Sequence, residues 1–243
     1  MNNDLLIFTP TYLEKDNIGP LLDQILSLNL PADILVIDDN SPDGTASLVK
    51  KYSFINNQIR LIKRNKKKGI GSAHKKGLNY AIANNYKYLI TLDSDFSHKT
   101  IYLPQLLQKL KKENLDIVIG SRFISKNSLA KWNIIRKTIT HFGHFLTEKI
   151  LDLPYDSSGA LRCYKLKNIN KNIITNIKSD DYAFFYESLS LLHLKKMKIS
   201  EISIDLPARL HGHSKMRLID IFNGFIGLFI LFFRLKKIKK KIY

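Results

Sequence analysis

Two aspartates separated by one residue follow an apolar run that is typical of a buried strand. Asp93-Ser94-Asp95 comes directly after Tyr-Leu-Ile-Thr-Leu at residues 88–92. Like charges at this spacing repel each other and resist desolvation, so the pair needs either bulk water or a cation. A divalent cation held by Asp93 and Asp95 could also bind a nucleotide diphosphate and neutralise the charge that develops as a bond to the diphosphate breaks. Solvated turns carry the same motif, so the motif alone leaves both interpretations open.

A second acidic stretch is more specific. The apolar run 33–37 is followed by Asp38, Asp39 and then Asn-Ser-Pro-Asp-Gly-Thr, which combines carboxylates with a turn and the start of a helix. Asp39 could bind a nucleotide base or ribose through hydrogen bonds. The alternative is a plain turn between strand and helix in which Asp38 packs against backbone amides.

The elements that must position these motifs alternate between strand and helix. The predicted strands are 5–8, 33–37, 58–63, 88–92 and 116–120, and the predicted helices between them are 17–28, 45–52, 72–84 and 103–112. Apolar strands separated by amphipathic helices indicate an α/β fold with a mostly parallel sheet and helices on both faces. In such a sheet ligands bind beyond the carboxyl ends of the strands, so polar clusters that are distant in sequence should meet at one edge.

The remainder of the chain is less regular. Helices are predicted at 134–151 and 182–194, a loop and strand at 157–164, and an edge strand at 199–206, where apolar and polar residues alternate. His141 and His144 are three residues apart on a predicted helix, but neither a further His nor the cysteine lies at ligand spacing. We therefore expect these histidines to pack rather than to bind a metal.

The composition indicates an anionic partner. The 243 residues include 39 Lys and Arg against 21 Asp and Glu, for a formal net charge of +18. Nucleic acid, an acidic membrane surface and a phosphorylated substrate would all satisfy this charge. The single cysteine, Cys163, excludes an intramolecular disulfide framework and a cysteine-based zinc cluster. The first residues, MNNDLLIFTPTY, show no secretory signal.

The segment 218–243 joins an apolar run to a basic tail. As a helix, residues 219–233 would span about 22 Å, which is short of the roughly 30 Å hydrocarbon core of a bilayer. We therefore expect an amphipathic or apolar helix that lies in the membrane surface or is partly inserted, with its tail on anionic headgroups at the cytoplasmic face. A core helix with a solvated tail is the alternative.

Several segments occur together in the order found in glycosyltransferase family two. They are FTPTYLEKDNI, VIDDNSPDGT, KKKGIGSAHKKGL, TLDSDFSH, GSRF, SSGALRCY and ARLHGHSKM, which together cover the chain from about residue 5 to 217. The chain thus resembles the dolichol-phosphate (polyprenol-phosphate) mannose synthase branch of that family. The resemblance implies a Rossmann-like GT-A domain over 1–217 and inverting transfer of a hexose to a polyprenyl or dolichyl phosphate. The usual nucleotide-sugar donor of this branch is GDP-mannose, and the implied cofactor is Mg²⁺ or Mn²⁺.

The resemblance also assigns roles to particular residues. Those that match the nucleotide-sugar site are Pro10, Tyr12, Glu14, Ile37, Asp39, Asp93, Ser94 and Lys215. Those that match the metal site are Asp93, Asp95 and Ser97, and those that match catalytic positions are Asp95, Arg122, Arg209 and Glu187. Leu13, His74 and the stretch 156–160 depart from the pattern of the family. For Glu187, an ion pair with a purely structural role is the alternative.

Basic residues make physical sense at such a site. An acceptor phosphate carries about −1.5 to −2 charges near neutral pH and is already a nucleophile. It therefore needs help in approaching an anionic diphosphate more than it needs a general base, and arginines supply permanently charged planar donors. Arg122 and Arg209 are the candidates, with a surface or carboxylate-paired arginine as the alternative for each.

Three functions are compared on this basis. The first is a membrane-surface sugar transferase, whose position is compatible with a small membrane-protein partner. The second is a soluble family-two transferase that uses UDP-glucose or UDP-N-acetylglucosamine, or a glycan hydroxyl, which normally requires a base. The third is a non-catalytic nucleic-acid-binding protein. It would explain the net charge but not the acidic pairs at two strand ends, so we expect no nucleic acid partner.

Overall fold

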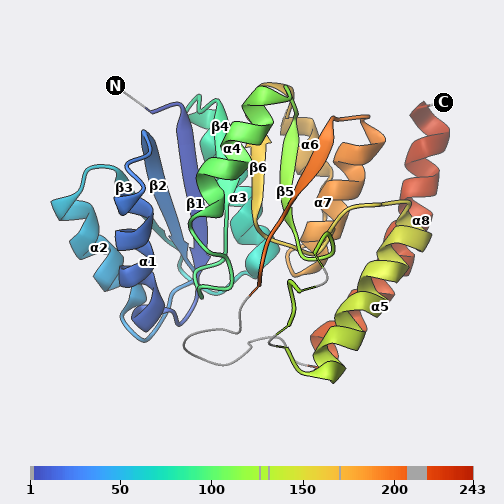
Figure 1. Cartoon of the computed structure of the whole chain (residues 1–243), viewed down its shortest axis with the longest axis horizontal. Coiled ribbons are helices and arrows are strands. Elements are labelled where there is room, and N and C mark those ends of the chain that lie inside the picture. Colours follow the sequence, from blue (N-terminus) through green and yellow to red (C-terminus); the bar gives the residue numbers. More distant parts are fainter. Residues whose placement is uncertain (1–2, 126, 131, 170, 207–217, 243) are drawn as a thin grey trace.

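The computed structural model describes residues 3–242 except 126, 131, 170 and 207–217 (Figure 1). The described residues form a seven-stranded sheet in the order β3-β2-β1-β4-β6-β5-β7. The strands are β1 (Leu5–Thr11), β2 (Ala32–Asp38), β3 (Ile59–Lys63), β4 (Tyr88–Thr91), β5 (Ile117–Ser121), β6 (Arg162–Lys165) and β7 (Ile199–Ser203). β6 pairs antiparallel with β4 and β5, and the other pairings are parallel.

Helices cover both faces of this sheet (Figure 1). They are α1 (Lys15–Ser27), α2 (Thr45–Ile55), α3 (Ile70–Ala83), α4 (Tyr102–Lys112), α5 (Ile134–Leu151), α6 (Lys171–Asn176), α7 (Ala183–Leu194) and α8 (Leu218–Ile242), with a 3₁₀ turn at Leu166–Asn168. The expected α/β fold with a mostly parallel sheet is therefore confirmed.

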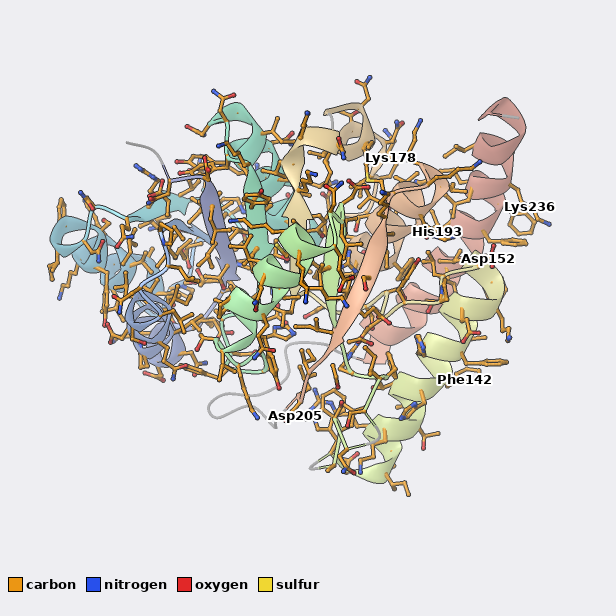
Figure 2. The ribbon with its side chains drawn as sticks, turned by 45° about the horizontal axis from the view of Figure 1, so that its top comes forward. Phe142, Asp152, Lys178, His193, Asp205 and Lys236 are labelled. Atoms are coloured by element: carbon orange, nitrogen blue, oxygen red, sulfur yellow. The ribbon has the colours of Figure 1, made fainter. Side chains whose placement is uncertain are left out.

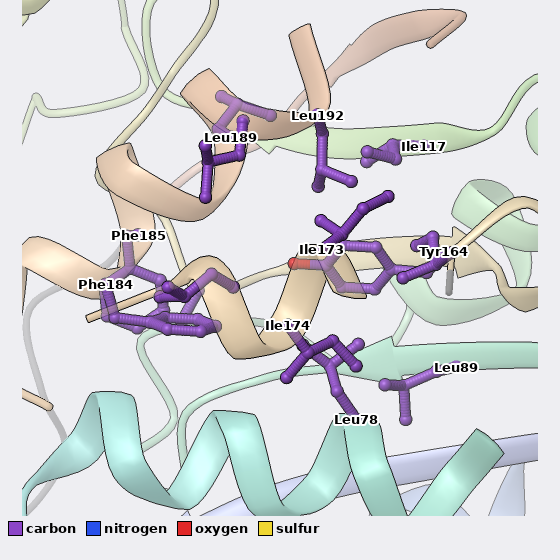
Figure 3. Packing of buried hydrophobic residues seen from close by; sticks show 14 of the residues in the cluster. Leu78, Leu89, Ile117, Tyr164, Ile173, Ile174, Phe184, Phe185, Leu189 and Leu192 are labelled. Carbon is purple, nitrogen blue, oxygen red and sulfur yellow. The ribbon is translucent and has the colours of Figure 1, made fainter. Parts of the chain in front are cut away.

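Alternation along the strands explains why two helical layers are needed. Successive residues of β2 enter opposite hydrophobic clusters, with Leu35 and Ile37 on one side and Ile34 and Val36 on the other. The first cluster packs against α3, α6, α7 and α8, and its packing around Tyr164 is shown in Figure 3. The second packs against α1 and α4. Both faces of each central strand are apolar, which is why these strands lack the period-two pattern of a half-exposed sheet.

Most of the predicted elements are confirmed, with boundaries that shift by a few residues. The predicted strand at 199–206 is β7, which lies at the edge of the sheet as expected. The sequence pattern did not predict the direction of β6, nor α6, because short apolar runs do not report which way a strand runs.

The helix predicted over 219–233 forms part of the longer α8, which continues into the basic tail. Leu228, Leu231 and Leu235 are buried and join the same hydrophobic cluster as α7, and α8 also contacts α5. A helix long and apolar enough to cross a membrane does not occur among the described residues.

Candidate functional site

The carboxyl ends of β1, β2, β4 and β5 share one edge of the sheet, which is the lower edge in Figure 1. Hydrogen bonds link the segments that follow these strands. Ser94 Oγ donates to the carbonyl of Pro10 at 3.1 Å, and the amide of Leu13 donates to Ser41 Oγ at 3.0 Å. The polar clusters predicted to meet do lie along this edge.

Asp38 forms the turn at the end of β2. Its carboxylate has no exposed surface and accepts hydrogen bonds from the Thr11 hydroxyl at 3.0 Å, the Ser41 amide at 2.9 Å and the Ser41 hydroxyl at 2.5 Å. The role of Asp38 is therefore the turn that the sequence offered as an alternative, and Asp39 is the residue that remains as a ligand-binding candidate.

Asp39 is joined to the lysine-rich loop that precedes α3. It is buried, forms an ion pair with Arg64 and accepts the amide of Lys68 at 3.1 Å. Arg64 also donates to Ser72 Oγ at 2.9 Å and to the carbonyl of Gly69 at 3.1 Å. Sequence reasoning missed Arg64. Its position directly after a strand that neighbours β2 is the signal that could have identified it.

The loop before α3 passes close to the segment before α7, and this approach requires glycine. Gly69 has φ +91°, and a Cβ on Gly69 would overlap the carbonyl oxygen of Asp180. The amide of Ser72 donates to this same carbonyl at 3.1 Å, and Lys75 pairs with the Asp180 carboxylate at 2.8 Å. The segment before α7 therefore supports the loop that contacts Asp39.

Other residues predicted to bind the nucleotide sugar lie around the end of β1. The Tyr12 ring has Lys67 Nζ 4.1 Å from its centre. Glu14 is buried, and its Oε2 accepts the side-chain amide of Asn17 at 2.7 Å. Pro10 is half-buried, whereas the side chain of Ile37 has no exposed surface and belongs to the hydrophobic core.

The acidic pair after β4 places one carboxylate inside the protein and one near the surface. Asp95 is buried, and its Oδ1 accepts the Ser97 amide at 3.1 Å and the Ser97 hydroxyl. The Asp93 side chain is 31% exposed, and its amide donates to Nδ1 of His98 at 3.2 Å. Ser97, predicted in the metal site, therefore orients Asp95 in this structure.

The donor set fits a hard divalent cation. Carboxylate oxygens suit Mg²⁺ and Mn²⁺, and Mg²⁺ sites commonly use one or two carboxylates and complete their coordination with water and substrate phosphates. No group of three or more His, Cys, Asp or Glu able to hold a metal occurs in the part of the chain that the structure describes. At such a site Asp93 and Asp95 could supply carboxylate ligands, and the phosphates of a diphosphate could supply others.

His98 lies against this pair as a neutral side chain. Burial lowers its pKa to about 4, although the charge of Asp95 acts in the opposite direction. A neutral imidazole can accept the Asp93 amide on Nδ1, in agreement with the hydrogen bond described above. His98 thus braces the acidic loop without adding positive charge.

Arg122, directly after β5, is held by a buried carboxylate. Asp156 accepts hydrogen bonds from Arg122 N at 3.0 Å, Nε at 2.8 Å and Nη2 at 2.6 Å, and Nη2 also donates to Ser158. Burial acts to lower the pKa of Arg122, but the charge and hydrogen bonding of Asp156, together with the charge of Asp93, raise the pKa overall. The predicted alternative of a carboxylate-paired arginine therefore holds, and the pairing lies beside the acidic motif.

The loop that carries Asp156 is itself clamped. Arg162 has no exposed surface and donates to the carbonyls of Ser157 at 2.8 Å, Gly159 at 2.9 Å and Phe185 at 2.9 Å, and to Ser188 Oγ at 3.1 Å. The start of β6 is thereby fastened to α7.

Glu187 on α7 is bound away from the acidic motif. It is almost fully buried and accepts the amides of Lys178 at 2.7 Å and Ser179 at 2.9 Å, and it pairs with Arg234 on α8. Burial acts to raise its pKa, but these hydrogen bonds hold the pKa below the usual range. The structure gives Glu187 the structural ion pair that was its alternative, and a catalytic role for it stays a prediction. Arg209 and Lys215, also predicted in the site, lie outside the described residues.

The histidines expected to pack do so. Phe123 stacks on His144 with ring centres 3.8 Å apart and meets His141 edge-on at 5.5 Å. His74 lies among Phe8, Phe184 and Phe185 at 4.9 to 5.2 Å, and burial lowers its pKa to about 3. Although it departs from the family pattern, His74 occupies an aromatic environment as a neutral ring.

Comparisons with known proteins agree with this architecture. The chain is 28% identical over 213 residues to an undecaprenyl-phosphate mannosyltransferase from Micrococcus luteus, covering 87% of each chain. It is 26% identical over 216 residues to a polyprenol monophosphomannose synthase from Mycolicibacterium smegmatis, covering 87% of this chain and 80% of the relative.

Among solved structures, glucosyl-3-phosphoglycerate synthase from Mycobacterium tuberculosis with Mn²⁺, UDP and phosphoglyceric acid superimposes with a TM-score of 0.67. The two proteins share 16% identity, and the match covers 95% of this chain and 78% of that one, which shows a shared GT-A-like α/β fold. The family model described as glycosyl transferase family 2 matches residues 6–185. Because this match spans most of the chain, the protein belongs to glycosyl transferase family 2 and is a glycosyltransferase.

Proposed function

We propose that this enzyme transfers mannose from GDP-mannose to a polyprenyl phosphate at a membrane surface, with inversion at the anomeric carbon. The observation that carries the proposal is the arrangement at the carboxyl edge, where the acidic pair Asp93 and Asp95 lies beside Arg122, whose orientation is fixed by Asp156. An acidic pair beside a held guanidinium suits a reaction between two phosphate-bearing molecules. The names of the Micrococcus and Mycolicibacterium relatives support the same acceptor and sugar.

Asp39, Tyr12 and Glu14 would bind the nucleotide on the donor side. The ion pair with Arg64 and the Lys68 amide hold Asp39 at the end of β2, where it would accept hydrogen bonds from a base or ribose. Lys67 beside the Tyr12 ring adds positive charge close to the diphosphate position.

Mg²⁺ or Mn²⁺ would be held by Asp93 and Asp95. When bound, the cation supplies charge neutralisation for the departing diphosphate. The Mn²⁺ and UDP bound in the structurally similar synthase support this assignment. In this chain, Ser97 holds the Asp95 carboxylate and His98 braces the loop, so the pair is preorganised for the cation.

Arg122 would bind the acceptor phosphate, with Arg209 and Lys215 proposed as further cationic groups. The phosphate is already a nucleophile, so the site needs charge compensation and does not need a strong general base. Attack on the face opposite the diphosphate would convert an α-linked donor to a β-linked product.

Exposed apolar side chains on α5 and α8 would face the membrane. We define the apolar helix face as Ile134, Ile135, Ile139, Phe142, Phe145, Ile226, Phe229, Ile230 and Phe233, each at least 41% exposed. The two helices contact each other, and Figure 2 shows Phe142 on the outer side of α5 and Lys236 on α8. An apolar stripe flanked by lysines suits the interface of an anionic bilayer at the cytoplasmic face, where the polyprenyl chain is dissolved. A small membrane-protein partner is the alternative occupant of this face.

Radiolabelled GDP-mannose incubated with polyprenyl phosphate and Mn²⁺ tests the proposal. The expected product is an acid-labile labelled glycolipid that partitions into organic solvent. UDP-glucose and UDP-N-acetylglucosamine, run in parallel, test the alternative donors, and a soluble glycan acceptor tests hydroxyl transfer. Label found only on the glycan, or glycolipid formed equally by Asp95→Ala, would contradict the proposal.

A further inference from the structure

Strands β2 and β3 are joined by an Arg–Asp pair at each end. At the amino end, Arg60 Nη2 lies 3.4 Å from Asp33 Oδ2, and the Arg60 side chain is 41% exposed. At the carboxyl end, Arg64 pairs with Asp39, and these side chains are only 3% and 7% exposed. Replacing a buried ion pair with apolar side chains is often neutral or stabilising, so burial alone gives such a pair no clear role in stability. The buried pair lies at the candidate site, and the exposed pair does not.

Each side-chain nitrogen of Arg64 has a partner in the protein. Nε donates to Asp39 Oδ1, Nη1 donates to Ser72 Oγ at 2.9 Å, and Nη2 donates to the carbonyl of Gly69 at 3.1 Å. The Arg64 amide also donates to the carbonyl of Asp38 at 2.8 Å. One planar guanidinium therefore joins the end of β2 to the start of α3. Because its nitrogens are used in this way, Arg64 is suited to holding other residues rather than to binding a ligand itself.

Asp39 holds the other end of the loop that follows Arg64. Its Oδ1 binds Arg64, and its Oδ2 accepts the amide of Lys68 at 3.1 Å. The loop therefore starts and ends on one carboxylate. We define the basic loop as residues 65–68, Asn-Lys-Lys-Lys, all of which are exposed. Its backbone is fixed at both ends, while its three lysines reach the surface.

The basic loop reaches the segment that follows β1. Lys67 Nζ lies 4.1 Å from the centre of the Tyr12 ring, and the Asp39 amide donates to the carbonyl of Thr11 at 3.0 Å. Three consecutive lysines concentrate positive charge at this place, and a concentration of one charge attracts ligands of the opposite charge. The end of β1, Asp39 and the basic loop thus form one connected unit with a negative group at one point and positive groups at another.

We propose that Arg64 is a positioning residue for nucleoside diphosphate binding, which holds Asp39 and the basic loop at a fixed spacing. The carboxylate then faces the base or ribose, and the loop lysines face the diphosphate. Arg64 acts without touching the nucleotide, because a loop that is already ordered spares the ligand the entropy cost of ordering it. This inference rests on the proposed nucleotide site at Asp39, but it does not depend on which base the donor carries.

Arg64→Gln and Arg64→Lys test the role of the guanidinium, and Arg60→Gln is the matched control. Arg64→Gln removes the ion pair, whereas Arg64→Lys keeps the charge but has one nitrogen in place of three. Both are expected to raise the Kd for nucleoside diphosphate about tenfold. The control breaks the Arg–Asp pair at the far end of the same two strands, and should leave the Kd within about twofold. Isothermal titration calorimetry with GDP and with UDP measures the Kd, and transfer assays should show a raised KM for the donor with kcat nearly unchanged.

Trypsin reports on the order of the basic loop directly, because it cleaves after lysine. The rate of cleavage after residues 66–68, measured by mass spectrometry without nucleotide, shows how often the loop opens. Arg64→Gln and Arg64→Lys should be cleaved there about tenfold faster than wild type and Arg60→Gln. Ser72→Ala keeps the buried ion pair and removes one acceptor, so it should fold and show a smaller rise of about two- to threefold. Thermal unfolding of every variant separates opening of the loop from loss of the fold.

The outcomes distinguish this inference from the nucleotide site on which it rests. If wild type binds neither GDP nor UDP, or if Asp39→Asn binds as tightly as wild type, the nucleotide site itself is wrong. If that site stands but Arg64→Gln binds as tightly as wild type, the positioning role is overturned. Wild-type Kd and cleavage in Arg64→Lys would also overturn it, because charge alone would then suffice. Should both Arg64 variants unfold, wild-type Kd and cleavage in Ser72→Ala would have the same meaning.

Discussion

The two halves of the site are built in different ways. On the proposed donor side, Asp39, Asp93 and Asp95 follow parallel strands, and the Lys68 amide and Ser97 are among the neighbours that orient Asp39 and Asp95. On the proposed acceptor side, Arg122 is oriented by Asp156, a residue 34 positions away in the loop that precedes the antiparallel strand β6. Asp95 is therefore oriented within its own short loop, whereas Arg122, like Asp39 with Arg64 and Lys68, depends on partners that only the folded sheet brings together.

Removal of the buried donor-side carboxylate should have the largest effect. If the proposed cation neutralises the leaving diphosphate, Asp95→Ala removes one of its ligands and should lower the transfer rate on the order of 10²- to 10³-fold. The fold should persist, since Ser97, which donates two hydrogen bonds to Asp95, belongs to the same short loop. Transfer assays and thermal unfolding check this. Full activity in the variant would exclude a metal role for the pair.

Disruption of the buried carboxylate Glu187 on α7 should instead act on stability. Glu187→Ala is expected to lower the free energy of unfolding by about 2–4 kcal/mol, because it leaves Arg234 and two amides without their buried partner. Urea unfolding measures this change. If Glu187 acts in catalysis, folded Glu187→Gln would lose activity out of proportion to its loss of stability.

The pH dependence of the same variant gives an independent check. The pKa of Glu187 is held below its ordinary 4.5 in the folded protein. The contribution of ionised Glu187 to the free energy of unfolding is therefore complete above pH 4.5 and is lost as the pH falls through the folded pKa. The difference in stability between wild type and Glu187→Gln should therefore shrink in acid. A difference that stays constant down to pH 3 would contradict this account.

The apolar helix face should affect location more than chemistry. Phe229→Ser/Phe233→Ser is expected to weaken binding to anionic vesicles by about tenfold or more, since both rings are over half exposed and would be buried in lipid. Phe54→Ser on α2, whose ring is 79% exposed, is the matched control. Flotation of vesicles with bound protein measures the effect. If Phe54→Ser weakens vesicle binding as much as the double variant does, the apolar helix face has no special role in membrane binding.

The smallest effect is expected beside Tyr12. Lys67→Ala should raise the KM for the nucleotide sugar about two- to fivefold with little change in kcat, because one exposed cation near a diphosphate contributes modestly. Lys66→Ala is the control on the same loop. A large fall in kcat would instead assign Lys67 to the chemical step.

The sequence was informative where chemistry is local. The β-strand ends before Asp39 and Asp93 could be predicted because apolar runs stop there, and these residues do lie along one edge. The pairs Arg64–Asp39, Arg122–Asp156 and Arg234–Glu187 could not be predicted, because each joins residues brought together by tertiary packing. The direction of β6, on which the second pair depends, leaves no trace in hydrophobic periodicity.

Arg162 has a consequence for the order in which the site assembles. Its guanidinium bridges the turn before β6 and the first helical turns of α7, so the acceptor side should become ordered only after α7 has docked. In hydrogen exchange, the backbone amides of 157–160 should exchange in the same opening event as those of α7, whereas the amides of β1 and β2 remain protected. The molecule would then assemble the proposed nucleotide-binding half of its site early, and would lose the proposed acceptor half first under stress.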